Sequence, residues 1–435
     1  MVNRPKIVAG IDVGSSKIAT IIAQINQEKE AINIVGTSSV PSLGIRKGQI
    51  VNIEEASAAI VNSVEAAERM AGYSLSRLIL SVGGAHIASQ NSHGVVAVAE
   101  PEGEINSEDI RRVIEAAKAV SIPSSREIIH VLPRTYTVDS QEGVADPIGM
   151  SGVRLEVETH IITGSTTAIR NLTKCVAEVG ANIENLVFSG IAAAEAVLTE
   201  TEKELGVVLV DIGGGTTNVL IYIEGSPVYT SVLPIGAKNV TNDLAIGLRL
   251  SLESAEKLKL SLAEKEAKEK VVEEAAEEEK KPETKDKDEI DLSRLGIEEA
   301  KSVSRKTVVE GIIKPRLNEI FSMVGQELQK SGFAGMTPSG IVLSGGGALT
   351  VSAVETCKRN LALPVRVGFP SLATGLIDDI LTPAFATAIG LIQFAGKESA
   401  FVSKMSSPPI GRLMDKLPGR GSLGKLVDMV KSFLP

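Results

Sequence analysis

Two short stretches of the chain place an aspartate, glycines and small hydroxyl residues directly after an apolar run. The first reads GIDVGSSKIATII and contains Asp12, Gly14, Ser15, Ser16 and Lys17. The second reads VDIGGGTTNVLIY and contains Asp211, Gly213, Gly214, Gly215, Thr216, Thr217 and Asn218. This order predicts a β-hairpin whose tip exposes backbone N–H groups, because glycine permits positive φ and the close approach of a phosphate. The carboxylates of Asp12 and Asp211, at the strand ends, are placed to orient Mg²⁺ through water.

A third glycine-rich turn, IVLSGGGALT, contains Gly345, Gly346, Gly347 and Ala348. We expect it to lead from a strand into a helix whose N-terminal amides suit the sugar and phosphate edge of a nucleotide. One such turn is more often only a tight turn, but three in this order predict a nucleotide site. The chain has neither the P-loop motif nor the dinucleotide fingerprint. Two similar hairpins from two similar lobes would hold ATP and Mg²⁺ from both sides, as in the actin-type clamp.

The elements that must position these turns alternate between strands and helices, which predicts an α/β fold. Short apolar runs stopped by glycine predict buried strands, namely KIVAGIDVG, LSRLILSVGG, ENLVFSG, LGVVLVDIGGG and PSGIVLSGGG. Apolar residues at helical spacing predict helices in EEASAAIVNSVEAAERMAG, TAIRNLTKCVAEVG and SAVETCKRNLAL.

Composition limits the number of lobes, the type of core and the classes of partner that the chain can have. A length of 435 residues predicts two or more lobes, and 43% hydrophobic residues with no Trp and 3% aromatic residues predict an aliphatic core. Scarce aromatic residues and a net charge of −9 argue against nucleic acid as a partner. Cys175 and Cys357 lie far apart without metal-site spacing, so we expect inert core thiols in a reducing compartment. No signal peptide or membrane-spanning run is expected.

The negative charge is concentrated in one segment. Residues 263–291 hold 13 acidic residues and 7 lysines, which contribute −6 of the total −9. The segment begins as a charged helix with Glu and Lys four residues apart and loses its apolar periodicity near Pro282. We interpret it as a solvated insertion rather than a binding tail.

Longer motifs resemble the FtsA family of bacterial cell-division proteins over nearly the whole chain. They are VFSGIAAAEAVLTETEKELGVVLVDIGGGTTNVLIY, NVTNDLAIGLRLSLESAEKLK, RKTVVEGIIKPR and LTPAFATAIGLIQF. The resemblance implies an actin-like ATPase fold of two related lobes, each with an inserted small subdomain. It also implies that Glu256 and Lys259, which share a helix face, lie beside the ribose and base of ATP.

The segment limits follow from these motifs and the resemblance. They are a first-lobe core over 1–81 and 163–199, an inserted subdomain over 82–162, a second-lobe core over 200–235 and 320–395, a small second-lobe subdomain over 236–319, a flexible linker over 396–420 and a terminal helix over 421–435. Filament formation and contacts with later division proteins would fall on the inserted subdomain by analogy.

Efficient catalysis is not expected. Chaperone and filament relatives place a water-orienting carboxylate or amide just before the small-residue helix, where this chain has Ser189, and Glu195 lies nearly two helical turns further on. A serine can hold water but cannot act as a carboxylate base, so we expect weak or no ATP hydrolysis. ATP is then a structural or switching ligand.

The last residues, SLGKLVDMVKSFLP, form an amphipathic pattern. Its apolar positions fall on one side of a helix and are Leu423, Leu426, Val427, Val430, Phe433 and Leu434. Such a helix can lie in the headgroup plane of an anionic membrane, although an arbitrary terminal helix more often folds back onto its own core. The preceding linker and the resemblance favour the membrane, with the protein on its cytoplasmic side at the division site.

In the FtsA family the small second-lobe subdomain receives the acidic C-terminal peptide of FtsZ. Arg305, Lys306 and Arg316 occupy the corresponding stretch, where a solvated helix face is an equally good interpretation. The resemblance also implies self-assembly into filaments that tether the FtsZ ring and recruit later division proteins. Two alternatives share the fold: an ATP-driven chaperone or sugar kinase, and a PilM-like pilus-assembly protein without a lipid-binding tail.

Overall fold

The computed structural model describes residues 6–26, 31–99, 103–275, 288–371, 373–375 and 379–406. Two units are separated along the chain, residues 1–395 and 396–435. The first unit contains two lobes and an inserted subdomain, each with its own hydrophobic core. In all three cores Ile, Val, Leu and Ala dominate, which confirms the predicted aliphatic interior.

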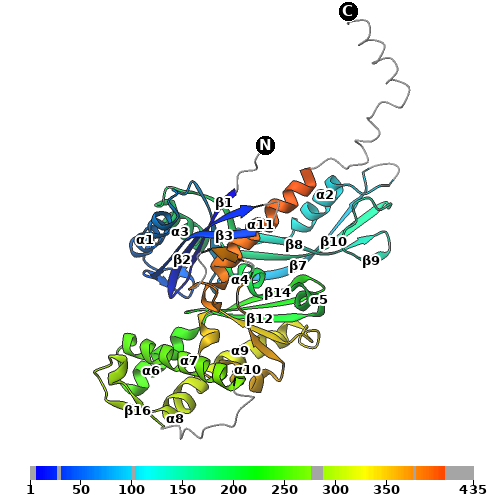
Figure 1. Ribbon diagram of the computed structural model, residues 1–435. Helices are drawn as coiled ribbons and strands as arrows, with labels where there is room; N and C mark the ends of the chain where they lie inside the picture. Colours follow the sequence, from blue (N-terminus) through cyan, green and yellow to red (C-terminus); the bar gives the residue numbers. More distant parts are fainter. Residues whose placement is uncertain are drawn as a thin grey trace, which may run out of the picture. The chain divides into compact units, whose positions relative to one another are not determined.

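The first lobe is built on a six-stranded sheet in the order β11-β6-β1-β2-β3-β19. Its strands are β1 (Lys6–Val13), β2 (Lys17–Asn26), β3 (Ala31–Pro41), β6 (Arg77–Val82), β11 (Asn182–Phe188) and β19 (Ala373–Gly375). The helices α1 (Ile53–Ala71) and α3 (Thr166–Ala177) pack on each other beside this sheet (Figure 1). A small hairpin, β4 (Ile45–Arg46) and β5 (Gln49–Ile50), precedes α1, and α4 (Ser189–Val197) follows β11.

The second lobe repeats this topology in a five-stranded sheet, β14-β13-β12-β17-β18. Its strands are β12 (Val207–Ile212), β13 (Thr217–Ile223), β14 (Ser226–Leu233), β17 (Ile341–Ser344) and β18 (Val365–Val367). In each lobe the first strand pairs antiparallel with the second and parallel with a later strand, β6 or β17. The two hairpins suggested by the sequence repeat are therefore confirmed as equivalent parts of two similar lobes.

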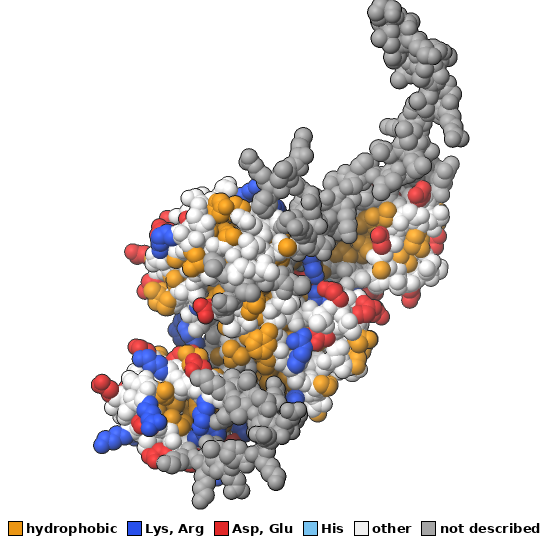
Figure 2. Space-filling view, in the orientation of Figure 1, with side chains coloured by type: hydrophobic (Ala, Val, Ile, Leu, Met, Phe, Trp, Pro, Cys, Tyr) orange, Lys and Arg blue, Asp and Glu red, His pale blue; other side chains and the backbone are white. Residues whose placement is uncertain are grey.

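Helices and short elements complete the second lobe. They are α5 (Glu200–Leu205), α6 (Ala237–Leu248), α7 (Leu252–Ala275), η1 (Ser293–Leu295), α8 (Arg305–Val308), the π-helical turn η2 (Val309–Ile313), α9 (Lys314–Ser331), η3 (Gly346–Leu349), α10 (Ala353–Leu361) and η4 (Pro383–Phe385), with a two-stranded sheet of β15 (Glu289–Asp291) and β16 (Ser302–Ser304). Acidic and basic side chains are interleaved over the described surface around α6, α7 and α8 (Figure 2).

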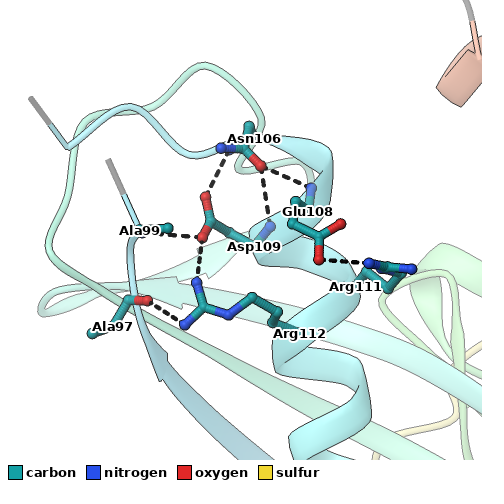
Figure 3. A network of polar contacts seen from close by, with 7 residues as sticks. All are labelled: Ala97, Ala99, Asn106, Glu108, Asp109, Arg111 and Arg112. Atoms are coloured by element: carbon teal, nitrogen blue, oxygen red, sulfur yellow. Dashed lines mark hydrogen bonds and ion pairs between the residues drawn. The ribbon is translucent and has the colours of Figure 1, made fainter. Parts of the chain in front are cut away.

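The inserted subdomain is a four-stranded antiparallel sheet, β7-β10-β8-β9, with one helix against it. The elements are β7 (Ala88–Ala97), α2 (Ser107–Lys118), β8 (Arg126–Val138), β9 (Gln141–Val144) and β10 (Arg154–Ser165). Figure 3 shows the start of α2, where the Asn106 side chain accepts from the backbone of Glu108 and Asp109. The fully buried Asp109 carboxylate in turn accepts from the Asn106 and Ala99 backbone N–H groups and from Arg112 at 2.9 Å. This capping box explains why the helix begins there.

Edge strands of the inserted sheet and the second-lobe sheet face each other, β7 against β14. Ser89 Oγ donates to the Thr230 carbonyl at 2.9 Å, and Asn91 Nδ2 donates to the Val228 carbonyl at 3.2 Å. The buried ring of His160 contacts Asn91 Oδ1 and Thr230 Oγ1, and burial lowers its pKa to about 3, so it is neutral near pH 7. Side chains of the inserted subdomain thus satisfy backbone groups on the edge of the other lobe.

Three details differ from the sequence predictions. The turn after β17 enters the short 3₁₀ helix η3 and α10 begins only at Ala353, because Gly345 takes a positive φ of 77° and redirects the chain. The limit placed at 319/320 falls inside α9, whose Pro315 lies in the first turn, where proline is tolerated. Helix α11 (Ala386–Ser406) continues past the predicted start of the linker at 396.

Other predictions are confirmed. Both cysteines are free and buried, and burial raises the pKa of the Cys357 thiol to about 12. The charged segment begins as a helix, since α7 ends at Ala275, and residues 276–287 lie outside the described structure.

Candidate functional site: a cavity between the two hairpins

The two hairpin tips and the third glycine turn line one cavity of about 310 Å³, called here the interlobe cavity. Fifteen of the eighteen residues predicted for the nucleotide site line it: Asp12, Gly14, Ser15, Ser16, Lys17, Asp211, Gly213, Gly214, Thr216, Asn218, Glu256, Lys259, Gly345, Gly346 and Gly347. The hairpins touch directly, since a Cβ added to Gly214 would lie 2.7 Å from that of Ser16. Residues that are far apart in the sequence thus meet in one place.

Three predicted residues do not line the interlobe cavity. Thr217 is fully buried, and its hydroxyl donates to the Ile235 carbonyl inside the second lobe. Gly215 packs against Ser15, and Ala348 belongs to the second-lobe core. Thr217 points away from the cavity because side chains alternate along β13, and Ala348 does so because the chain turns at η3. The sequence motifs do not show either direction.

The two aspartates sit at equivalent strand ends in surroundings that disfavour their charge. Asp211 is 6% exposed, and burial together with the nearby Asp12 raises its pKa to about 7. Burial also raises the pKa of Asp12, partly opposed by a 2.8 Å hydrogen bond from Ser81 and by Lys17. Neither carboxylate ionises readily while both are buried close together. A cation bound between them would favour the ionised form of both, so the pair is a candidate cation site.

Lys17 follows Asp12 in the first hairpin and lies over an aromatic ring. Its ammonium is 3.1 Å from the centroid of the Phe385 ring, in η4. Burial lowers the pKa of Lys17 to about 8, although Asp12 opposes that shift.

Glu256 and Lys259 lie on one face of α7, as their spacing predicts, and bond to each other. The Lys259 ammonium is 2.7 Å from Glu256 Oε2 and 2.9 Å from Thr241 Oγ1. Thr241 in turn donates to the same Glu256 oxygen at 2.5 Å. This cluster forms a fixed polar wall of the interlobe cavity.

Ser189 lines the cavity at the start of α4 and is tied to the second hairpin. Its Oγ accepts from Asn218 Nδ2 at 3.2 Å, and the same amide donates to Asp211 Oδ2 at 2.8 Å. Asn218 is 4% exposed, and its Oδ1 has no hydrogen-bond partner among the described residues. Glu195 lies away from the cavity lining, with Oε1 3.1 Å from the buried Lys203 ammonium.

Sequence reasoning missed several lining residues, which are Val13, Gly48, Ser81, Gly83, Gly84, Ala237, Lys238, Leu260, Pro383, Ala384 and Thr387. A signal existed for Ser81, because LILSVGG ends a strand parallel to β1 and the carboxyl ends of parallel strands meet at one sheet edge. Lys238 had none, since its contact with the first hairpin depends on the packing of two distant segments.

The three basic residues of the predicted partner surface have different surroundings. Arg316 donates to both carboxylate oxygens of Asp243, at 2.5 and 2.9 Å, and also pairs with Glu319. Arg305 and Lys306 begin α8 and line a second cavity of about 370 Å³ together with Asp288. The backbone of both residues donates to Asp288.

The apolar residues predicted to contact a membrane, Leu423 to Leu434, lie outside the described part of the chain. Within the described part, no helix is both long and apolar enough to span a bilayer.

The duplicated lobes and the cavity between their hairpins define the actin-like ATPase fold. Solved structures agree at the level of fold. The chain superposes on "PilM-PilN type IV pilus biogenesis complex" with a TM-score of 0.60 and 16% identity, covering 89% of this chain and 98% of that one. It superposes on MreB5 of Spiroplasma citri bound to ADP with a TM-score of 0.51 and 13% identity, covering 92% and 98%.

Sequence comparisons narrow the class to one family. Family models described as "SHS2 domain inserted in FTSA" and "Cell division protein FtsA" match residues 84–163 and 208–390. The protein called "Cell division protein FtsA" in Pseudomonas aeruginosa is 38% identical over 401 residues, 92% of each chain. Its namesake in Bacillus subtilis is 37% identical over 394 residues, 90% of this chain and 84% of that one. The chain belongs to the FtsA family of actin-like cell division proteins.

Proposed function

We propose that the interlobe cavity binds ATP with Mg²⁺ and that this chain is the ATP-dependent membrane tether of the FtsZ ring. The observation that carries the proposal is the meeting of two aspartate-ended hairpins, from two lobes of equal topology, over one cavity. The related fold of MreB5 has been solved with ADP bound, which supports the choice of nucleotide.

The residues present fit a magnesium nucleotide. Glycine is required for the tight turns that bring backbone N–H groups to the cavity, since a Cβ on Gly14 would lie 2.9 Å from the Lys17 carbonyl oxygen and one on Gly345 would lie 2.4 Å from the Ile212 carbonyl oxygen. Asn218 Oδ1 is a buried acceptor without a partner among the described residues, which suits a metal-bound water. Asp12 and Asp211 would hold Mg²⁺ through water, and the bound cation would supply the charge that neutralises them beside the phosphates.

The remaining residues of the interlobe cavity would each contact a different part of the nucleotide. Backbone N–H groups of both hairpins, with Lys17, would hold the phosphates, and the Gly345–Gly347 turn would hold the adenosine. Glu256 and Lys259 would bond to the ribose and base. Ser189 would orient water without acting as a carboxylate base, so hydrolysis is weak or absent and occupancy, rather than turnover, sets the state of the lobes.

Membrane attachment is assigned to the amphipathic helix that the sequence predicts over 421–435. Its six apolar side chains contribute about 1 kcal/mol each and must offset the ordering of a short helix, so a single copy binds weakly. Assembly into filaments would place many tails on one surface and make attachment multivalent. ATP-dependent polymerisation would then control residence on the cytoplasmic face of the membrane, and the inserted subdomain would recruit later division proteins.

The acidic C-terminal peptide of FtsZ is assigned to the surface around Arg305, Lys306 and Arg316. Arg305 and Lys306 line the second cavity beside Asp288, and they would attract the carboxylates of the peptide. Arg316 is matched by Asp243 and Glu319 and would position α9.

Deletion of Gly421–Pro435 tests the proposal. The truncated protein should lose co-sedimentation with anionic liposomes while its affinity for MgATP, measured by calorimetry, stays unchanged. A matched variant, Leu426→Ser with Val430→Ser, should reproduce the loss without shortening the chain. Continued sedimentation of both proteins would refute the membrane assignment, and absence of saturable MgATP binding by the full-length protein would refute the nucleotide assignment.

A further inference from the structure

Lys238 is held by the second hairpin at its backbone. It is the second residue of α6, whose first two N–H groups donate to the carbonyls of Gly213 and Gly214, both at 2.9 Å. The helix approaches the hairpin so closely that a Cβ on Gly236 would lie 2.5 Å from the Gly213 carbonyl oxygen. The base of the Lys238 side chain therefore moves with the second lobe.

The tip of the same side chain contacts the first lobe. Its ammonium donates to the Ser15 carbonyl at 2.8 Å, across 223 residues of sequence. Ser15 is in turn fixed within the first lobe, because its hydroxyl accepts from the Gly48 N–H at 2.8 Å. Lys238 thus joins the tips of the two hairpins at the wall of the interlobe cavity.

A count of charges distinguishes Lys238 from the other lysines of the cavity. The lining contains three carboxylates and three ammonium groups, which are Asp12, Asp211, Glu256, Lys17, Lys238 and Lys259. Lys259 is paired with Glu256, and Lys17 is coupled to Asp12 and lies over the Phe385 ring. Among the described residues, the acceptor found for Lys238 is a neutral carbonyl, which leaves donors of its ammonium available to an anion.

We propose that Lys238 recognises the terminal phosphate of ATP and, by keeping its bond to Ser15, makes contact between the hairpins stronger with ATP than with ADP. The inference rests on the proposed nucleotide site and assigns one residue the discrimination between the two ligands. MgATP carries one more negative charge than MgADP, and that charge lies at the phosphate end of the nucleotide, where the hairpins meet. The ammonium is bonded to the first lobe while its backbone is bonded to the second, and it is attracted to this charge without leaving Ser15, since it has three donors.

Lys238→Met removes the charge and keeps an unbranched side chain one atom shorter, and Lys238→Arg keeps the charge. Lys238 is exposed to solvent, so the lower end of the range for charge-assisted hydrogen bonds applies. We expect Lys238→Met to weaken MgATP binding about tenfold and MgADP binding by less than about threefold, with Lys238→Arg close to wild type. Lys257→Met, on an exposed lysine paired with Glu253 on α7, is the matched control and should change neither affinity.

The test measures both affinities by calorimetry and follows hydrogen exchange of the segment 14–17 with each nucleotide. Wild-type protein should protect this segment more with MgATP than with MgADP, and Lys238→Met should abolish the difference. An unchanged ratio of the two affinities in Lys238→Met would overturn the proposal: no loss for either nucleotide would show that the ammonium is not used, and equal losses for both would indicate a structural role only. If the wild-type protein bound neither nucleotide, the proposed function itself would fail, and this assignment with it.

Discussion

Replacement of Asp211 by Asn should stabilise the protein without ligand and weaken its binding of MgATP. The pKa of Asp211 is raised from 3.8 to about 7, so the folded protein retains a proton that the unfolded chain has lost. A raised pKa contributes stability that is fully present below pH 3.8 and is lost as the pH rises through 7. Between pH 5 and pH 8 the wild-type protein should therefore lose about 3 kcal/mol of unfolding free energy through this group, a loss that Asp211→Asn avoids.

Urea unfolding of both proteins at pH 5 and pH 8, without nucleotide and with EDTA, measures this difference directly. The advantage of Asp211→Asn should grow by about 3 kcal/mol between the two pH values, whereas Asp146→Asn, at an exposed position in the inserted subdomain, should show no such growth. Magnesium with ATP should stabilise the wild-type protein more at pH 8 than at pH 6, because the cation requires the ionised carboxylate. An advantage that is independent of pH would refute the argument that burial of this charge is the cause.

Two further substitutions test contacts outside the cavity lining. Gly390→Ala should destabilise the protein by roughly 3 kcal/mol in urea unfolding, because an added Cβ would lie 1.7 Å from the Ala192 carbonyl oxygen where α11 meets α4, and an unchanged midpoint would contradict this close contact. Asp109→Ala should lower the unfolding free energy by about 2 kcal/mol, since it removes the Asp109 half of the capping box of α2 and a carboxylate paired with Arg112, while MgATP affinity remains as in the wild type. Reduced nucleotide binding by Asp109→Ala would show that the inserted subdomain is coupled to the cavity more tightly than its hydrogen bonds indicate.

Local patterns predicted most of the fold. Apolar runs stopped by glycine gave β1, β6, β11, β12 and β17, and helical periodicity gave α1, α3 and α10, because burial and backbone freedom act within a few residues of sequence. The duplication of the lobes was visible because both hairpins carry the same order of residue types. The path after β17 was not predicted correctly, since Gly345 redirects the chain in a way that composition does not encode.

The candidate site was predicted where its residues lie on the hairpin tips themselves. The site residues that the sequence did not predict depend on tertiary packing. Ser81 reaches Asp12 only because β6 lies beside β1, and Lys238 reaches Ser15 only because α6 is bonded to the second hairpin. The raised pKa of Asp211 likewise follows from burial and from a partner about two hundred residues away. Such couplings exist only after the lobes have formed.

The contact of β7 with β14 also determines what happens when the inserted subdomain is deleted. Strand β14 is the last strand of the second-lobe sheet, and Ser89 and Asn91 occupy backbone groups that an additional strand would otherwise bond. Excision of residues 84–163 would therefore uncover a row of unsatisfied amides and carbonyls on the remaining protein, which is a template for adhesion between copies. A deletion protein that precipitates would report this exposed edge, so a soluble version of the two lobes alone needs charged or proline residues introduced on β14.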